Sequence, residues 1–299
     1  MSALRADPAP ATAVSEVLRE GARRLEALGV AGAGDESARL WARLIGQTVG
    51  EVWLRRDGDA APELRERFQD AVERWAGGEP AAYATGRAGF RTLELETDRR
   101  ALIPRPETEG LVEHVLEWGR RREPASDWGA ALDVGTGTGC IALSLAVEGC
   151  FGHVVATDVS EDALALARGN AALVAPPLPV EFRFGSLFEP AWGEVFDVIV
   201  ANPPYVTAGE FEKLDMGVRC HEPRGALVSG EDGLEHIRGL LEGAGSHLAA
   251  HGLLALEVDC TRAEAAAALA RGAGWREVRL EPDVFGRLRY LLTMKESEQ

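Results

Sequence analysis

The first part of the chain carries apolar residues at the spacing of α-helices. Amphipathic helices are predicted over residues 13–56, and Pro62 and Gly77–Gly78 suit the two ends of a further helix. The apolar positions that repeat with this period over residues 13–56 are Val14, Val17, Leu18, Leu25, Leu28, Leu40, Trp41, Leu44 and Ile45. We therefore predict a small helical domain over residues 1–85.

A different pattern follows over residues 86–104. Leu93, Leu95 and Thr97 alternate with charged neighbours, and such alternation is typical of half-buried β-strands. We predict two short strands joined by a turn and interpret this stretch as a β-hairpin linker.

Over residues 105–299, short apolar strands alternate with helices. Strands are predicted at GAALDVG, HVVATDV, VEFRFGS, VFDVIVA and GLLALEV, a pattern that indicates a parallel sheet covered by helices on both faces. A long irregular loop is predicted at residues 206–231. The chain ends on two predicted strands, WREVRL and LRYLLTM, without a helix between them, which implies an antiparallel edge. The predicted fold class is α/β, with a seven-stranded, mostly parallel sheet.

Composition and charge narrow the functional classes. With 299 residues, 46% of them hydrophobic, the chain can bury a core. No apolar stretch reaches the roughly 20 residues of a membrane span and the first residues do not resemble a secretion signal, so a cytoplasmic protein without a membrane partner is expected. A net charge of −16 repels phosphate backbones, so we expect no stable binding to nucleic acid. Four scattered cysteines predict reduced structural thiols and no metal site.

The segment ALDVGTGTGCIALSLA joins a predicted strand to a helix through a glycine-rich turn. Gly135, Gly137 and Gly139 allow the backbone to turn tightly and to approach a ligand at the positive end of the helix. The spacing differs from the dinucleotide pattern GxGxxG, and no GK[ST] follows, so a pyrophosphate site is less favoured. A glycine loop alone can also be a plain strand-to-helix connection.

The next predicted strand brings Asp158 to its carboxyl end. A carboxylate there can accept both hydrogen bonds of a ribose diol, and Asp133 leads into the glycine loop. This arrangement resembles the S-adenosylmethionine-binding half of the class I methyltransferases, which implies a Rossmann-like fold and S-adenosyl-L-methionine as the cofactor. The cofactor-binding residues that the resemblance implies are Asp133, Gly135, Thr136, Gly137, Thr138, Gly139 and Asp158.

The strand VFDVIVA ends in the tetrapeptide NPPY, which comprises Asn202, Pro203, Pro204 and Tyr205. Ligands bind at the carboxyl ends of parallel strands, so NPPY is predicted to face the same crevice as the glycine loop. The prolines hold their carbonyls rigidly, and Asn202 offers a further acceptor. Two such acceptors can hold a planar NH₂ and turn its nitrogen toward an electrophilic methyl group, while Tyr205 packs against the acceptor. The alternative is a rigid turn with Tyr205 in the core.

The segment GEPAAYATGRAGFRTLELETDRRALIPRPETEGLVE resembles the signature of the glutamine-N5 protein methyltransferases that modify peptide-chain release factors. The similarity extends to the helical domain, to EPRGALVSGEDGL and to DVFGRLRY. It implies methyl transfer to the glutamine of the Gly-Gly-Gln motif in class 1 release factors, with residues 1–85 docking that protein; we expect a monomer. In LIPRPETE, a pair between Arg105 and Glu107 could close the crevice.

The resemblance also implies the roles of particular residues. The catalytic residues would be Asn202, Pro203 and Tyr205, the glutamine-binding residues Asn202, Pro203, Pro204 and Tyr205, and the further cofactor contacts Ser186, Leu187 and Asn202. Some positions depart from the family's pattern. An acidic residue is usual where Ser186 stands, and the atypical residues farther along are Cys220, His221, Asp259 and Thr261.

Three alternatives stay open. The same chemistry could serve another protein, or a pathway-specific amide or amine, because the loop of residues 206–231 is predicted to lie beside the site. Adenine N6 methylation of nucleic acid rests on NPPY alone, and the acidic charge argues against it. The third alternative is a non-catalytic binding module, since a fold does not determine a function.

Overall fold

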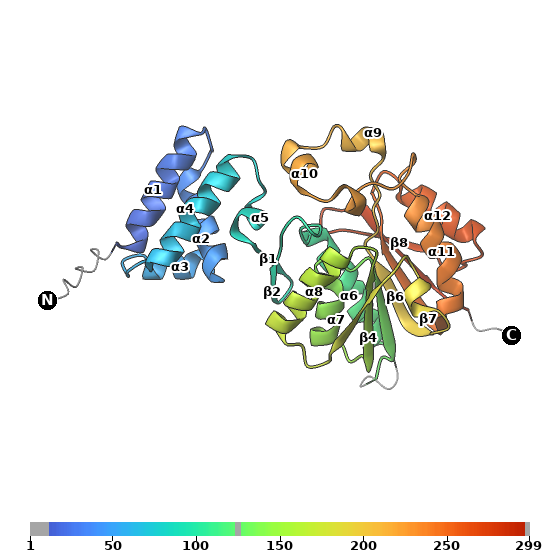
Figure 1. Cartoon of the computed structure of the whole chain (residues 1–299). Coiled ribbons are helices and arrows are strands. Elements are labelled where there is room, and N and C mark those ends of the chain that lie inside the picture. The colour runs from blue at the N-terminus through green and yellow to red at the C-terminus, as the bar shows by residue number, and fades with distance from the viewer. Residues whose placement is uncertain (1–11, 123–126, 297–299) are drawn as a thin grey trace, which may run out of the picture. The chain divides into compact units, whose positions relative to one another are not determined.

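The structure, a computed structural model, describes residues 12–122 and 127–296. The chain forms two compact units that join between Arg87 and Ala88 (Figure 1). The first unit is helical. Its helices are α1 (Val14–Ala27), α2 (Ala33–Ile45), α3 (Val49–Arg55), α4 (Pro62–Ala76) and α5 (Ala81–Thr85).

The core of the helical unit follows the predicted periodicity. Most of the predicted apolar positions are buried, although Leu28 is exposed, and the rings of Trp41 and Phe68 meet edge-on with centroids 5.3 Å apart. Helix α5 was not predicted, and α3 was not distinguished as a separate helix within residues 13–56, because helices of two turns or fewer show little amphipathic period. Helix α3 begins instead at a capping box formed by Thr48 and Glu51.

A two-stranded sheet pairs β1 (Arg87–Phe90) with β2 (Leu93–Glu96). Leu93 and Leu95 are buried, as their alternation predicts, and the partner strand β1 precedes β2. Arg91 makes the turn with a φ of 52°, and its guanidinium is bonded to the carboxylates of Glu113 and Glu148 at 2.8 Å each. These anchors place the turn ahead of Leu93.

The second unit is built on a seven-stranded sheet with the order β5-β4-β3-β6-β7-β9-β8. Its strands are β3 (Ala130–Val134), β4 (His153–Asp158), β5 (Val180–Phe184), β6 (Phe196–Ala201), β7 (Leu248–Glu257), β8 (Arg279–Pro282) and β9 (Leu288–Met294). Strands β3 to β7 pair in parallel, and β9 runs antiparallel to β7 and β8, which confirms the predicted sheet. Strand β8 begins later than predicted, because Trp275 is buried and donates its Nε1 hydrogen to the Leu241 carbonyl at 3.0 Å.

Helices cover both faces of this sheet (Figure 1). Helices α6 (Pro106–Arg120) and α7 (Cys140–Glu148) pack on one face, and α11 (Glu235–His247) and α12 (Ala263–Gly272) pack on the other. Helix α8 (Glu161–Val174) lies against β4 and β5. The central parallel strands β3, β4 and β6 are therefore buried on both sides, whereas the edge strand β5 is partly exposed, and the carboxyl ends of the parallel strands share one edge of the sheet.

Residues 206–231 contain short helices rather than only irregular loop. They are α9 (Ala208–Phe211), α10 (Met216–His221) and the 3₁₀ turn η2 (Arg224–Ala226). Thr207 caps α9, Asp215 caps α10, and Val206 forms a β-bridge with Val228. The prediction of an irregular loop was wrong here, because helices this short leave no periodic signal.

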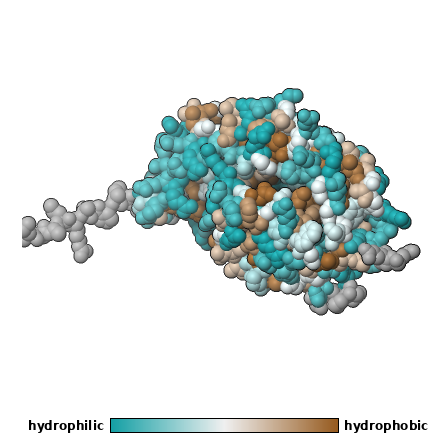
Figure 2. Space-filling view, turned by 45° about the vertical axis from the view of Figure 1, so that its right-hand side comes forward, coloured by the Kyte–Doolittle hydropathy of each residue, from teal (hydrophilic) through white to brown (hydrophobic). Residues whose placement is uncertain are grey.

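The visible face in Figure 2 is mostly hydrophilic, with apolar residues scattered over it. The exposed apolar side chains include Leu54, Trp192, Val284 and Phe285. Scattered apolar residues of this kind are ordinary on protein surfaces. Of the helices within residues 12–122 and 127–296, none is long and apolar enough to cross a membrane.

Candidate active site

A cavity of about 370 Å³ lies in the second unit at the carboxyl ends of β3, β4 and β6. Its walls are formed by the glycine loop, the ends of these strands, residues 100–105 and the segment before α11. The predicted site residues that line it are Gly135, Thr136, Gly137, Thr138, Asp158, Ser186, Leu187, Asn202, Pro203 and Pro204. Sequence motifs far apart in the chain thus meet in one cavity, whereas Asp133, Gly139 and Tyr205 do not line it.

The glycines of the loop have different structural roles. Gly135 and Gly137 adopt φ values of 76° and 56°, and a Cβ at Gly135 would stand in open space within the cavity. Gly139 begins α7 with a φ of 84°, and a Cβ there would lie 3.3 Å from Ala167. The first two therefore bring bare backbone to a ligand, and the third allows α7 to pack closely on α8.

Asp133 lies beneath the loop and is fully buried. Its Oδ2 accepts hydrogen bonds from Thr136 Oγ1 at 2.6 Å and from the Ala142 N–H at 3.2 Å, which tie the loop to α7. Its Oδ1 has no partner among the described residues. These hydrogen bonds let the carboxyl support the loop from below. Burial raises the pKa of Asp133 to about 7, close to neutral pH.

Asp158 lies at the end of β4, and its carboxylate can accept further hydrogen bonds from a ligand. Its Oδ2 accepts from the Gly137 N–H and its Oδ1 from the Ser160 N–H, both at 2.9 Å. Each carboxylate oxygen can accept two hydrogen bonds, so one site on each oxygen is left for a ligand. Burial raises the pKa of Asp158, while the backbone donors act in the opposite direction. The geometry suits the recognition of two neighbouring hydroxyl groups.

Asn202, Pro203 and Pro204 of NPPY form a further part of the cavity wall. Asn202 is half-buried, and its Nδ2 donates to Thr108 Oγ1 at 3.0 Å. Pro203 and Pro204 line the cavity without backbone N–H groups, so their carbonyls are the polar atoms that they can offer. Burial raises the pKa of Tyr205 to about 12, so its phenol is neutral at physiological pH.

Two residues near Asn202 were missed by sequence reasoning. Thr108 lines the cavity and donates its hydroxyl hydrogen to Glu257 Oε2 at 2.7 Å. Glu257 is the last residue of β7 and is fully buried. Thr108 belongs to the segment LIPRPETE and Glu257 lies in the predicted strand GLLALEV, but neither pattern shows that their side chains meet, so only the fold brings them together at the site.

Arg105 closes one side of the cavity with a different partner from the expected one. Its Nη2 donates to both carboxylate oxygens of Glu222, at 2.6 and 2.7 Å, whereas a pair with Glu107 had been predicted. Glu222 follows α10 and its side chain is almost wholly buried. The pair therefore ties the segment after NPPY to the start of α6.

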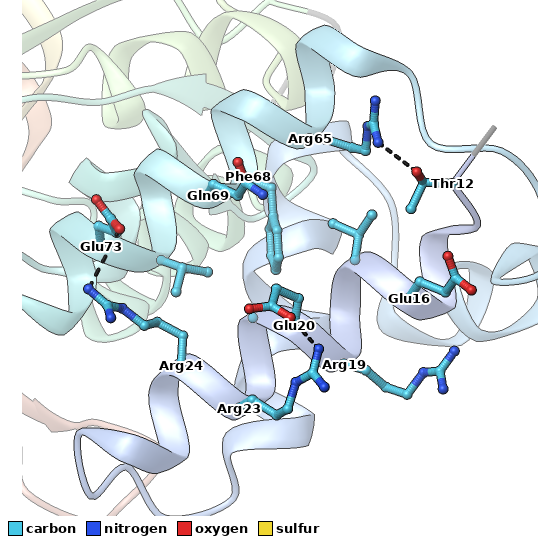
Figure 3. A pocket seen from close by; sticks show the side chains of 13 residues that line it. Thr12, Glu16, Arg19, Glu20, Arg23, Arg24, Arg65, Phe68, Gln69 and Glu73 are labelled. Carbon is cyan, nitrogen blue, oxygen red and sulfur yellow. Dashed lines mark hydrogen bonds and ion pairs between the residues drawn. The ribbon is translucent and has the colours of Figure 1, made fainter. Parts of the chain in front are cut away.

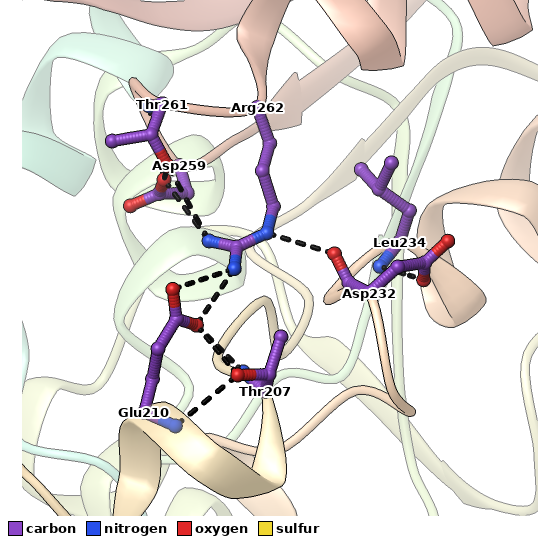
Figure 4. Close-up of polar contacts among 7 residues, drawn as sticks. All are labelled: Thr207, Glu210, Asp232, Leu234, Asp259, Thr261 and Arg262. Atoms are coloured by element: carbon purple, nitrogen blue, oxygen red, sulfur yellow. Dashed lines mark hydrogen bonds and ion pairs between the residues drawn. The ribbon is translucent and has the colours of Figure 1, made fainter.

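A second arginine holds the same segment from another direction (Figure 4). Arg262 Nη2 donates to both oxygens of Glu210 at 2.7 Å, and its Nη1 and Nε donate to the Asp259 carboxylate at 3.2 Å and the Asp232 carbonyl at 2.8 Å. The bonds from Arg262 lower the pKa of Glu210 to about 2. Thr261 also donates to Asp259. Asp259 and Thr261, two of the residues that depart from the family's pattern, thus belong to a clamp on α9.

The remaining candidates carry no separate chemistry. Burial raises the pKa of the Cys140 thiol to about 12, so it remains a thiol although it lines the cavity. His221 donates through Nδ1 to the Gly217 carbonyl of its own helix at 3.0 Å. None of the four cysteines forms a disulfide in the structure, and Cys150 and Cys220 are exposed.

A larger cavity, of about 640 Å³, lies in the helical unit between α1 and α4 (Figure 3). Two of its arginines contact neighbouring side chains: Arg24 lies 3.6 Å from Glu73, and Arg65 donates to Thr12 at 2.6 Å. It contains no predicted site residue. The cavity of the second unit is therefore the candidate active site.

Comparisons with known proteins agree with this assignment. Residues 121–219 match the family described as Methyltransferase small domain, and residues 16–86 match the PrmC N-terminal domain. A methyltransferase structure from Pyrococcus furiosus shares the fold, with a TM-score of 0.50 and 22% identity, over 69% of this chain and 90% of that one. The class I methyltransferase fold is thereby confirmed.

Two relatives extend the similarity to nearly the whole chain. The release factor glutamine methyltransferase of Deinococcus radiodurans is 39% identical over 276 residues, which are 92% of this chain and 96% of the relative. Its counterpart from Cereibacter sphaeroides is 37% identical over 273 residues, 91% of this chain and 95% of the relative. The resemblance noted in the sequence is confirmed. The chain belongs to the release factor glutamine methyltransferase family.

Proposed function

We propose that the chain transfers a methyl group from S-adenosyl-L-methionine to the side-chain amide nitrogen of the glutamine in the Gly-Gly-Gln motif of class 1 release factors. Family membership supports the choice of substrate. The observation that carries the proposal is a single cavity with two walls. We call Gly135–Thr138 with Asp158 the donor wall, and Asn202, Pro203 and Pro204 the acceptor wall.

The donor wall fits S-adenosylmethionine. It offers bare glycine backbone, acceptor capacity on Asp158, and a volume within the range of small-molecule sites. When bound, S-adenosylmethionine supplies an electrophilic methyl group. We assign donor binding to Gly135, Thr136, Gly137, Thr138, Asp158, Ser186, Leu187 and Asn202. Asp133 and Gly139 do not line the cavity, so a contact between them and the donor stays a prediction.

The acceptor wall orients the amide nitrogen of the substrate. Because Asn202 gives its Nδ2 hydrogen to Thr108, its Oδ1 points elsewhere and can accept a hydrogen from the glutamine NH₂. The rigid carbonyl of Pro203 is the second acceptor. Two acceptors favour a nitrogen that withdraws its lone pair from conjugation and becomes more positive in the transition state. The methylated nitrogen is acidic and releases its extra proton to water.

Substrate binding is assigned to all of NPPY, with Asn202, Pro203 and Tyr205 in the catalytic role. Tyr205 does not line the cavity, so its contact with the glutamine stays a prediction. The helical unit is proposed to dock the release factor, because it matches the PrmC N-terminal domain and exposes Trp53 and Leu54 on α3. A cytoplasmic location follows, since release factors act there.

Peptide mass spectrometry of a release factor before and after treatment tests this proposal. We expect one added methyl group on the Gly-Gly-Gln peptide with the wild-type chain and far less methylation with Asn202→Ala over the same time. An unmodified peptide would overturn the proposal, provided that calorimetry shows donor binding in the same sample. Labelling of a lysate with radioactive donor would then reveal another protein acceptor.

A further inference from the structure

A buried run of hydrogen bonds leads away from Asn202. Asn202 Nδ2 donates to Thr108 Oγ1 at 3.0 Å, and Thr108 Oγ1 donates to Glu257 Oε2 at 2.7 Å. Thr108 lies in the first turn of α6 and Glu257 ends β7, and only 2% and 1% of their surfaces are exposed. Buried polar groups in such a run each constrain the hydrogen-bonding direction of the next one.

Glu257 sets the direction of both bonds. An ionised carboxylate can only accept, so Thr108 must give it its single hydroxyl hydrogen. The Thr108 oxygen can then only accept from Asn202, so the Asn202 amide must turn its NH₂ toward Thr108 and its Oδ1 away. We propose that Thr108 and Glu257 are positioning residues that hold the Asn202 amide with Oδ1 as the acceptor for the substrate NH₂. This inference rests on the proposed function.

The reverse orientation would disable the acceptor wall. If Thr108 donated to Asn202 Oδ1, the Asn202 NH₂ would face the substrate NH₂, and one of the two acceptors would be lost. A hydroxyl that is not committed to Glu257 can rotate into that arrangement. The buried carboxylate therefore acts on the reaction through Thr108, without touching the substrate.

The surroundings of Glu257 give this arrangement a pH dependence. Burial raises the pKa of Glu257 to about 7, and its Oε1 has no partner among the described residues. The titratable and charged groups that face it are Arg105, Glu107, Cys140, Tyr205, Arg289 and Tyr290. As the pH falls through about 7, Glu257 gains a proton that it can donate to Thr108, and Thr108 is then free to donate to Asn202 Oδ1.

Replacements of Thr108 test the inference directly. Thr108→Val should lower kcat for the release factor by roughly 10- to 100-fold, the cost of a misplaced reacting group, while the KM for the donor changes little. Thr108→Ser keeps the hydroxyl and should restore most of kcat. The matched control is Thr293→Val, because Thr293 in β9 is equally buried and its hydroxyl has no partner among the described residues. This control should keep wild-type kcat.

A double-mutant cycle shows whether Thr108 acts through Asn202. In an Asn202→Ala background, measured in single turnovers, Thr108→Val should cause little further loss. The same fold loss in both backgrounds would overturn the inference. Wild-type activity is measured in the same assay, so a chain that methylates no release factor would refute the proposed function, whereas a fully active Thr108→Val would refute only the positioning role.

The pH profile provides a readout that a purely structural role would not move, and it uses a variant of almost unchanged shape. Wild-type kcat should fall below about pH 7, and Glu257→Gln, which cannot titrate, should lower the plateau and remove part of that fall. Asp133 has a pKa in the same range, so only the part removed by Glu257→Gln belongs to Glu257. An unchanged profile in Glu257→Gln would overturn the inference.

Discussion

The donor wall and the acceptor wall face the same cavity but are built differently. On the donor wall, glycine backbone lines the cavity and one backbone N–H, that of Gly137, bonds Asp158, which lies 21 residues farther along. On the acceptor wall, the orientation of Asn202 depends on side chains that come from distant parts of the chain. Thr108 is 94 residues from Asn202 and 149 residues from Glu257.

Because of this difference, the two walls should respond differently to single substitutions. A wall made of backbone keeps its shape when a neighbouring side chain changes, so single substitutions there should act mainly on donor affinity. A wall that depends on a buried run of side-chain hydrogen bonds loses its orientation when any member is removed, so substitutions there should act on the rate of methyl transfer.

The largest effect should come from Asn202→Ala, which removes an acceptor from the acceptor wall. We expect kcat to fall roughly 10²- to 10³-fold, as when one preorganised hydrogen-bonding group is lost. The matched control is Asn170→Ala, because Asn170 bonds only backbone, that of Glu96 at 2.7 and 2.9 Å and that of Thr138 at 2.9 Å. It should lose about 3 kcal/mol of unfolding free energy and little kcat. Equal losses of kcat in Asn202→Ala and Asn170→Ala would contradict a specific role of Asn202 in methyl transfer.

The donor wall is tested by Asp158→Asn. The amide keeps one acceptor oxygen but turns an NH₂ toward either the Gly137 or the Ser160 N–H, and the charge is lost. The dissociation constant of the donor should rise about 10- to 100-fold, the worth of hydrogen bonds to a charged group, with kcat at saturating donor nearly unchanged. Calorimetry and steady-state kinetics measure the two quantities. A fall in kcat at unchanged donor affinity would refute the prediction that substitutions on the donor wall act mainly on donor affinity.

A smaller effect is expected from the clamp behind the acceptor wall. Arg262→Ala should lower the unfolding free energy by about 1 kcal/mol, because nearly half of the Glu210 side chain is exposed and solvent screens the pair. The pKa of Glu210 is lowered from 4.5 to about 2, so this stabilisation is complete above about pH 4.5 and is lost as the pH falls toward 2. Denaturant unfolding at pH 7 and pH 3 should show a smaller difference from wild type at pH 3. If Arg262→Ala loses the same unfolding free energy at both pH values, the pair with the Glu210 carboxylate is not the source of that loss.

The same contrast explains what the sequence could predict. The strands, the glycine turn and NPPY are local patterns, and they were found. The contact between Thr108 and Glu257 was not predicted, although both residues lie in the quoted segments LIPRPETE and GLLALEV, because it depends on strand order and on how α6 packs against β7. Arg105 was expected to pair with Glu107, two residues along the chain, but the short helices of residues 206–231 bring Glu222 to it instead.

The smallest expected effect concerns Ser186, which lines the cavity after β5 where the family usually has an acidic residue. A carboxylate there can accept a hydrogen from the adenine amine more strongly than a hydroxyl can. Ser186→Asp should therefore tighten donor binding by about 2- to 10-fold, the worth of one hydrogen bond.

Glu189 limits this gain. Its carboxylate accepts from the Ser186 N–H at 3.2 Å and would repel a new charge at residue 186. The gain in donor affinity, measured by calorimetry, should thus be larger when Glu189→Gln is added, and Ser186→Asn, which adds no charge, serves as the control. If neither aspartate variant binds the donor more tightly, an acid at residue 186 adds nothing, and donor affinity depends on the glycine backbone and Asp158.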